Sequence, residues 1–280
     1  MKTLIFSLIL FFGFGAFAQV FDAPLNNFYE DNNGENSISR VPVPYQHVRK
    51  ADVFWAKRIW RVIDLREKIN HPLYYPEQPT QGRISLVSVI LQGIEEGSLT
   101  AYDALNDDFT ERLSEDQVRN ILVQTDTIRD RFDPFGNMLP DTVIEKTFQP
   151  ADVTMIRIKE DWFFDKQRSV IEVRILGLCP VKEKYDANGE YQGTVPIFWV
   201  YFPEARSIFV KYEVFNRFND GQRLSYDDWF FKRFFGSYII KESNVYDRYI
   251  TQYAQQMDAL LESERIEDAT FIFEHDLWEY

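Results

Sequence analysis

Apolar residues change their spacing along the chain, and the spacing predicts which elements form. In "ADVFWAKRIWRVIDLREKIN" (51–70) they recur with a helical period, so we expect an amphipathic helix that ends before Pro72. A second helix is expected over about 84–96, closed by Gly97. A third should follow Ser114, because Ser-x-x-Gln is a capping box that satisfies the first backbone N–H groups of a helix. The first half of the chain is therefore predicted to be helical.

From residue 153 onward the apolar positions alternate, which indicates strands whose side chains point to opposite faces. Two strands around a turn at 165–168 form a hairpin, and Asn188-Gly189 predicts a second tight turn. Further strands are expected in "TVPIFWVYF" (194–202) and "SIFVKYEVF" (207–215), joined by "PEAR". Because the connections are short, the four strands are predicted to form an antiparallel meander.

The end of the chain returns to helical spacing. Ser225 begins a second capping box, so we expect a helix through "DWFFKRFFGSYIIK" (228–241), with Gly236 as a break point. A last long helix should begin near Ser243 or Asn244. The predicted fold class is α+β, with an N-terminal arm and helices, a four-stranded antiparallel meander and two C-terminal helices. The predicted regions are a signal peptide (1–18), an extended arm (19–50), a helical region (51–124), a connection (125–152) and an antiparallel sheet with C-terminal helices (153–280).

The first segment has the pattern of a secretory signal peptide. Lys2 precedes an apolar stretch that ends in Ala16-Phe17-Ala18, so cleavage is expected after Ala18. The next residue is Gln19 rather than the Cys that carries the lipid of a bacterial lipoprotein. No later stretch approaches the roughly 20 apolar residues that span a bilayer. We therefore expect an exported protein that does not insert into a membrane directly.

An extended arm is predicted after the signal peptide. "NNFYEDNNGENSISRVPVPY" (26–45) is rich in Asn, Gly and Pro and has no apolar period. The segment is either a loose terminus or an arm that orders against a neighbouring subunit. In the second case, its anchors include Phe28, Tyr29 and Tyr45.

Composition favours protein partners over nucleic acid. The net charge is −13, and no basic patch is concentrated enough to neutralise phosphates. Aromatic residues make up 16% of the chain, and interface cores are enriched in them. The tetrapeptide DWFF occurs at 161–164 and at 228–231, once with a strand period and once after a capping box. Its candidate contact residues are Phe163, Trp229, Phe230 and Phe231.

Arg66 falls inside the apolar arc of the helix predicted at 51–70. A buried guanidinium needs a carboxylate or carbonyl partner. Arg66 is thus a candidate for an internal ion pair or for an interface contact.

The sequence contains no motif for catalysis, a cofactor or a metal. Three histidines are scattered, and the single Cys179 suits buried packing. One loop holds three acids but lacks the ligand spacing, central Gly and terminal Glu of an EF-hand: Asp126, Asp130 and Asp133. We therefore expect no enzyme activity and no cofactor.

Three stretches carry a resemblance to a known family: "RIWRVIDLREKINHPLYYP" (58–76), "DWFFDKQRSVIEVRILGLCPV" (161–181) and "WFFKRFFGSYIIKESNVYDRY" (229–249). They resemble the gliding-motility GldN (PorN) family of Bacteroidetes. The resemblance implies a non-enzymatic periplasmic component of the type IX secretion and gliding machinery. It also implies a homo-oligomeric ring beneath the outer membrane, formed with a lipoprotein of the GldK (PorK) type, and contact with the periplasmic part of a GldM (PorM) type motor subunit.

Two functions remain open at this stage. The first is a ring-forming scaffold that binds its partners through the arm and the aromatic faces. The alternative is a secreted periplasmic hydrolase or a glycan-binding protein, in which aromatics stack on sugar rings. A deep pocket lined by Trp and paired carboxylates would favour the alternative, whereas a flat aromatic surface would favour the scaffold.

Overall fold

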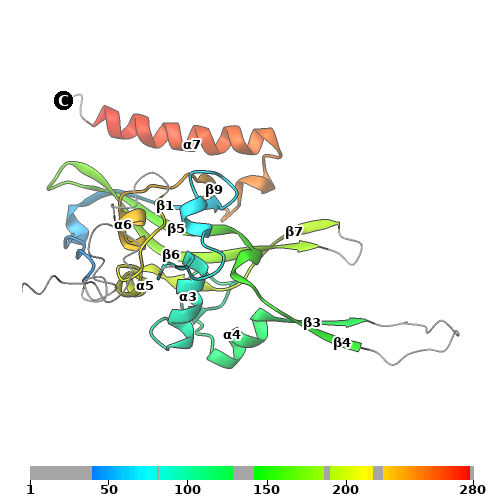
Figure 1. Ribbon diagram of the computed structural model, residues 1–280. Coiled ribbons are helices and arrows are strands. Elements are labelled where there is room, and N and C mark those ends of the chain that lie inside the picture. The colour runs from blue at the N-terminus through cyan, green and yellow to red at the C-terminus, as the bar shows by residue number, and fades with distance from the viewer. Residues whose placement is uncertain (1–39, 81, 129–141, 186–189, 217–222, 278–280) are drawn as a thin grey trace, which may run out of the picture.

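The computed structural model has an α+β fold built around one antiparallel sheet, which confirms the predicted class (Figure 1). It describes residues 40–80, 82–128, 142–185, 190–216 and 223–277. The described part of the sheet has seven strands in the order β2-β8-β6-β5-β1-β9, with β7 also paired to β6. The strands are β1 (Val53–Asp64), β2 (Ala101–Tyr102), β5 (Val153–Asp165), β6 (Val170–Tyr185), β7 (Tyr191–Pro196), β8 (Trp199–Tyr201) and β9 (Tyr238–Glu242).

The helix predicted at 51–70 is wrong, because most of this segment is the strand β1. β1 lies between β5 and β9 and pairs with both, and Ile59–Ile63 is buried without interruption. A strand covered on both faces loses the alternation of apolar and polar residues that identifies half-exposed strands. The β-branched and aromatic residues that dominate this stretch fit a strand.

The hairpin predicted from residue 153 is confirmed as β5 and β6, which pair along almost their whole length. The meander is not four-stranded, however, and the strand predicted at 207–215 is wrong. Residues Phe202–Phe209 form the helix α5 instead, with Pro203 in its first turn. Proline suits this position, because its missing N–H would have no partner inside the helix.

Two predicted helices are confirmed. α3 (Leu86–Glu95) is capped by the Ser85 side chain, which accepts a hydrogen bond from Ser88 N. α4 (Glu115–Leu122) begins with the capping box at Ser114. Residues of α3 and α5 share the main core cluster with strand residues such as Ile156 and Ile158. The helices α3, α5 and α6 contribute residues to this core cluster, and α7 lies along β9, the last strand in the sheet order (Figure 1).

The C-terminal helices are present but begin and end elsewhere than predicted. The capping box at Ser225 opens α6 (Tyr226–Phe231), which ends far short of residue 241, and the chain then enters β9. The last helix is α7 (Met257–Asp276), which begins well after Asn244. Asn244 forms a turn, because its side chain bonds to the backbone of Glu242 and Arg248.

The remaining described elements are short or lie apart from the sheet. A separate two-stranded ribbon extends from the body beside the β6–β7 hairpin (Figure 1). Its strands are β3 (Val123–Ile128) and β4 (Thr142–Thr147). The other elements are α2 (His71–Tyr74) and the 3-10 turns η1 (Lys50–Asp52), η2 (Pro150–Asp152) and η3 (Ile250–Gln252).

Candidate interaction surfaces

Residues 40–50 are the described end of the predicted arm. They contact the body of the same chain. The Tyr45 ring lies under two guanidinium groups, 4.2 Å from that of Arg206 and 5.2 Å from that of Arg174. Arg206 Nη2 donates a 2.7 Å hydrogen bond to Val43 O, and Arg174 Nη2 donates one of 2.5 Å to Gln46 O. Tyr45 is therefore an intramolecular anchor of the arm.

A buried ion pair supports this attachment. Arg206 of α5 and Asp227 of α6 are each 5% exposed. Arg206 Nε lies 2.7 Å from Asp227 Oδ1, and Arg206 Nη2 lies 3.0 Å from Asp227 Oδ2. Two parallel bonds of this kind fix both side chains. Sequence reasoning missed the pair because it placed Arg206 in a turn between two strands.

Arg66 was predicted to lie on the apolar side of a helix over residues 51–70. This prediction is wrong, because most of that segment is the strand β1. Arg66 lies in the turn after β1, and its side chain is 59% exposed. Its guanidinium donates hydrogen bonds to Asp64, the shortest of 2.7 Å, and one of 3.0 Å to Glu183. The hydrogen bonds from Arg66 lower the pKa of Asp64. Arg66 is therefore an exposed, ion-paired surface residue.

The two DWFF copies occupy different elements, as their surroundings predict. The first copy is in β5, where Phe163 is 7% exposed and lies under Arg174. The second copy is in α6, where Trp229 and Phe230 are buried. Phe231 is 59% exposed and is the outward-facing aromatic among these candidates. Phe163, Trp229 and Phe230 are packed inside the body of the chain.

Several predicted residues lie outside the described part of the chain. The signal peptide and the arm anchors Phe28 and Tyr29 belong to this group, as do Asp130 and Asp133. Asp126 lies in β3, where only the backbone is described.

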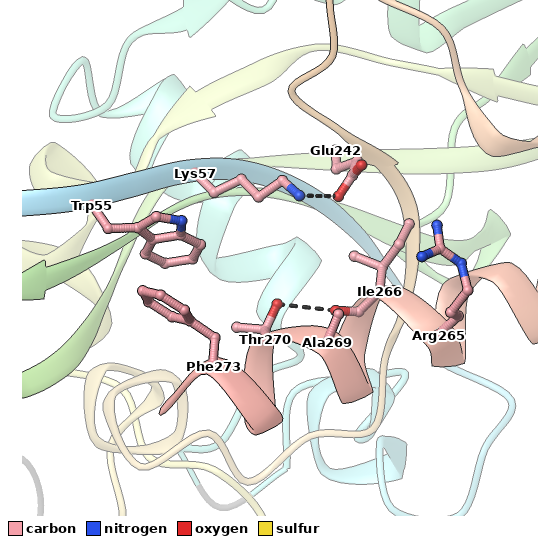
Figure 2. Close-up of a pocket in the computed structure, with 8 residues that line it drawn as sticks. All are labelled: Trp55, Lys57, Glu242, Arg265, Ile266, Ala269, Thr270 and Phe273. Carbon is pink, nitrogen blue, oxygen red and sulfur yellow. Dashed lines mark hydrogen bonds and ion pairs between the residues drawn. The ribbon is translucent and has the colours of Figure 1, made fainter. Parts of the chain in front are cut away.

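A hollow lies between α7 and the strands β1 and β9, with a volume of about 250 Å³ (Figure 2). The Trp55 and Phe273 rings line one end, with their centroids 4.9 Å apart. Glu242 is the carboxylate in this lining, and its Oε2 lies 2.5 Å from Lys57 Nζ. A glycosidase needs two carboxyl groups on opposite sides of the scissile bond. This hollow therefore lacks the acid pair of such a site.

The described residues hold no group of three or more His, Cys, Asp or Glu side chains placed to bind a metal ion. Cys179 is buried, as predicted, and its burial raises the pKa of the thiol to about 12. None of the described helices is both long and apolar enough to cross a membrane.

The fold and these surfaces define an α+β protein with exposed aromatic residues such as Phe231 and Phe234 on its body. A family model described as "Gliding motility associated protein GldN" matches residues 48–279, a range that includes the whole described sheet and α7. The chain belongs to the GldN family. No curated protein matches the chain. As a GldN-family member, it is a component of gliding motility and type IX secretion.

Proposed function

We propose that the protein is a non-enzymatic scaffold subunit of a periplasmic ring in the type IX secretion and gliding machinery. In this role it binds an outer-membrane lipoprotein of the GldK (PorK) type and the periplasmic part of a GldM (PorM) type motor subunit. It is held at the inner face of the outer membrane by the lipoprotein and does not insert into the membrane itself. The observation that carries the proposal is the family match over residues 48–279.

Three features of the chain support this role. The signal peptide pattern at 1–18, followed by Gln19, suits an exported subunit that reaches the membrane through a lipidated partner. The exposed aromatic residues on the body include Phe231 and Phe234, which are suited to protein contacts. The attached segment 40–50 gives the preceding segment, 19–39, a fixed starting point from which to reach a neighbouring subunit.

The test is gentle extraction of outer membranes from cells that carry a tagged copy of the chain. We expect the chain to co-purify in a large complex with a lipoprotein at one fixed ratio. A chain that is recovered as a freely diffusing monomer would contradict the scaffold role.

The contribution of the arm is tested by deleting residues 23–39, which keeps the signal peptide and the contacts of Val43 and Tyr45. We expect the deletion to weaken assembly while the unfolding midpoint of the purified chain stays the same. Tyr45→Ala is the matched variant. Tyr45 contacts the body of its own chain, so removing its ring should lower the free energy of unfolding. An unchanged ring in the deletion variant would exclude a role for the arm.

The exposed aromatic of the second DWFF copy is tested with Phe231→Ser. Phe231 is more than half exposed, so the substitution should leave the fold intact and reduce recovery of the complex. Tyr246→Ser is the control, because Tyr246 is an exposed aromatic in the loop after β9 and not in α6. If the complex is recovered equally with both variants, Phe231 is not part of the contact surface.

A further inference from the structure

α7 contacts the body along one narrow face. Ser263, Ile266 and Thr270 are its buried residues. Ser263 Oγ accepts a 2.8 Å hydrogen bond from Ile239 N of β9, and Ile266 packs in a cluster with Ile59, Ile239 and Ile250. These positions recur every three or four residues, so they lie on one side of the helix.

The opposite side of α7 carries large apolar residues that the described body does not cover. Each is between 52% and 68% exposed: Met257, Leu260, Leu261, Phe271 and Ile272. At 100° per residue, all five fall within the third of the helix that faces away from Ile266. We call this surface, together with Glu264 and Asp268, the outer stripe. From Met257 to Ile272 it is about 22 Å long at 1.5 Å per residue.

The charges on the outer stripe restrict what can cover it. Glu264 and Asp268 are exposed and stand at its centre, between the two apolar groups. The sequence of α7 contains seven Asp or Glu residues and a single Arg or Lys, which is Arg265. Arg265 is bonded to Glu262, with Nε 2.7 Å from Oε2. The stripe is therefore apolar at both ends and acidic in the middle.

A second copy of α7 does not fit this pattern. In an antiparallel pair, the apolar ends would meet, but Glu264 and Asp268 of each helix would face the same residues of the other. Four carboxylates would then be brought together away from water, and like charges in such contacts are unfavourable. An anionic membrane surface would be repelled for the same reason.

We propose that the outer stripe of α7 binds a basic amphipathic helix of another protein. The partner helix places Lys or Arg opposite Glu264 and Asp268 and apolar residues opposite the two ends of the stripe. About four helical turns of the partner match the length of the stripe. The proposal rests on the proposed function, in which the chain binds other proteins, and it specifies the chemistry of one such contact.

The first test places a photoreactive amino acid at Leu261 or at Phe271 of the full-length chain in its own cells. The cross-linked peptide is then sequenced by mass spectrometry. The same group at Tyr246, an exposed position off the helix, is the control. We expect both stripe positions to capture one segment of another protein, with apolar residues at helical spacing around Lys or Arg.

Other outcomes of this test overturn the proposal. They are capture of α7 from a second copy, capture of lipid, capture of an acidic segment, and no capture above the level at Tyr246. Each stripe position is exposed, so the modified chains should fold like the unmodified one, which circular dichroism checks.

The second test changes only the charge of the stripe. Glu264→Gln/Asp268→Asn should reduce the cross-link yield from Leu261 about threefold to tenfold, as expected for losing two exposed charge pairs. Glu264→Lys/Asp268→Lys should reduce it further, because the new charges repel the basic partner. A yield that stays the same, or that rises with lysine, overturns the proposal.

Failure of this inference differs from failure of the proposed function. If the tagged chain still purifies in a fixed complex with a lipoprotein but the stripe captures nothing, the scaffold role stands and the docking site is excluded. If the chain is a free monomer, the scaffold role itself fails.

Discussion

Removing the carboxylate of the buried ion pair should destabilise the protein strongly. In Asp227→Ala, Arg206 keeps its bond to Val43 O and its contact with the Tyr45 ring, but it loses both bonds to the carboxylate. Because Arg206 is 5% exposed, water cannot replace them. Breaking one side of a buried pair costs about 3–5 kcal/mol, since the remaining charge is left without an opposite charge.

The assay is urea unfolding of the purified chain, followed by tryptophan fluorescence and circular dichroism. At about 2–4 °C per kcal/mol for a chain of this size, the same loss lowers the melting temperature by about 6–20 °C. Asp258→Ala is the control, because Asp258 is an exposed acid in the first turn of α7. Its free energy of unfolding should change by less than about 0.5 kcal/mol.

A double variant separates the ion pair from other effects of the substitution. Arg206→Met/Asp227→Leu removes both charges, so it should recover most of the stability that Asp227→Ala loses. The reasoning is refuted if Asp227→Ala costs less than about 1 kcal/mol, the value typical of exposed pairs. It is also refuted if the double variant is less stable than the single one.

Three further predictions concern other parts of the fold. Gly177→Ala should lower the free energy of unfolding by about 1–3 kcal/mol in urea, because the added Cβ would lie 2.4 Å from Phe109 Cζ; an unchanged midpoint would contradict this packing. Cys179 should react with iodoacetamide at pH 8 only after unfolding, because the pKa of its buried thiol is about 12; rapid labelling of the folded chain would contradict its burial. The lowered pKa of Asp64 beside Arg66 contributes stability that is present above the unfolded-state pKa of about 3.9 and is lost as pH falls through the folded-state value. Asp64→Asn should therefore make unfolding stability less dependent on pH below about 5, and an unchanged slope would contradict the assignment.

Local signals in the sequence predict local structure well. The capping boxes at Ser114 and Ser225 each depend on residues three positions apart, and both open a helix. The β5–β6 hairpin was also predictable, because its turn and its alternating strands are adjacent in the chain. These features need no information from distant segments.

Segments that are defined by distant neighbours were predicted wrongly. β1 has apolar residues on both faces, and only its position between β5 and β9 distinguishes it from a helix. The second DWFF copy offered Trp229, Phe230 and Phe231 together as contact candidates, and the packing of α6 shows that Phe231 is the exposed one of the three. The arm contact between Val43 and Arg206 joins residues 163 positions apart, so no local pattern could reveal it.

The position of β1 also sets an order of events for folding. Its Arg58 contacts Asp161, 103 residues later, and Ser243, 185 residues later. β1, the first strand in the described residues, thus finds both of its neighbours only after nearly the whole polypeptide is available, and such distant pairings form slowly. Until then its aromatic residues and its unpaired backbone are open to aggregation. A factor that shields β1 until β9 is available should therefore raise the yield of correctly folded chain.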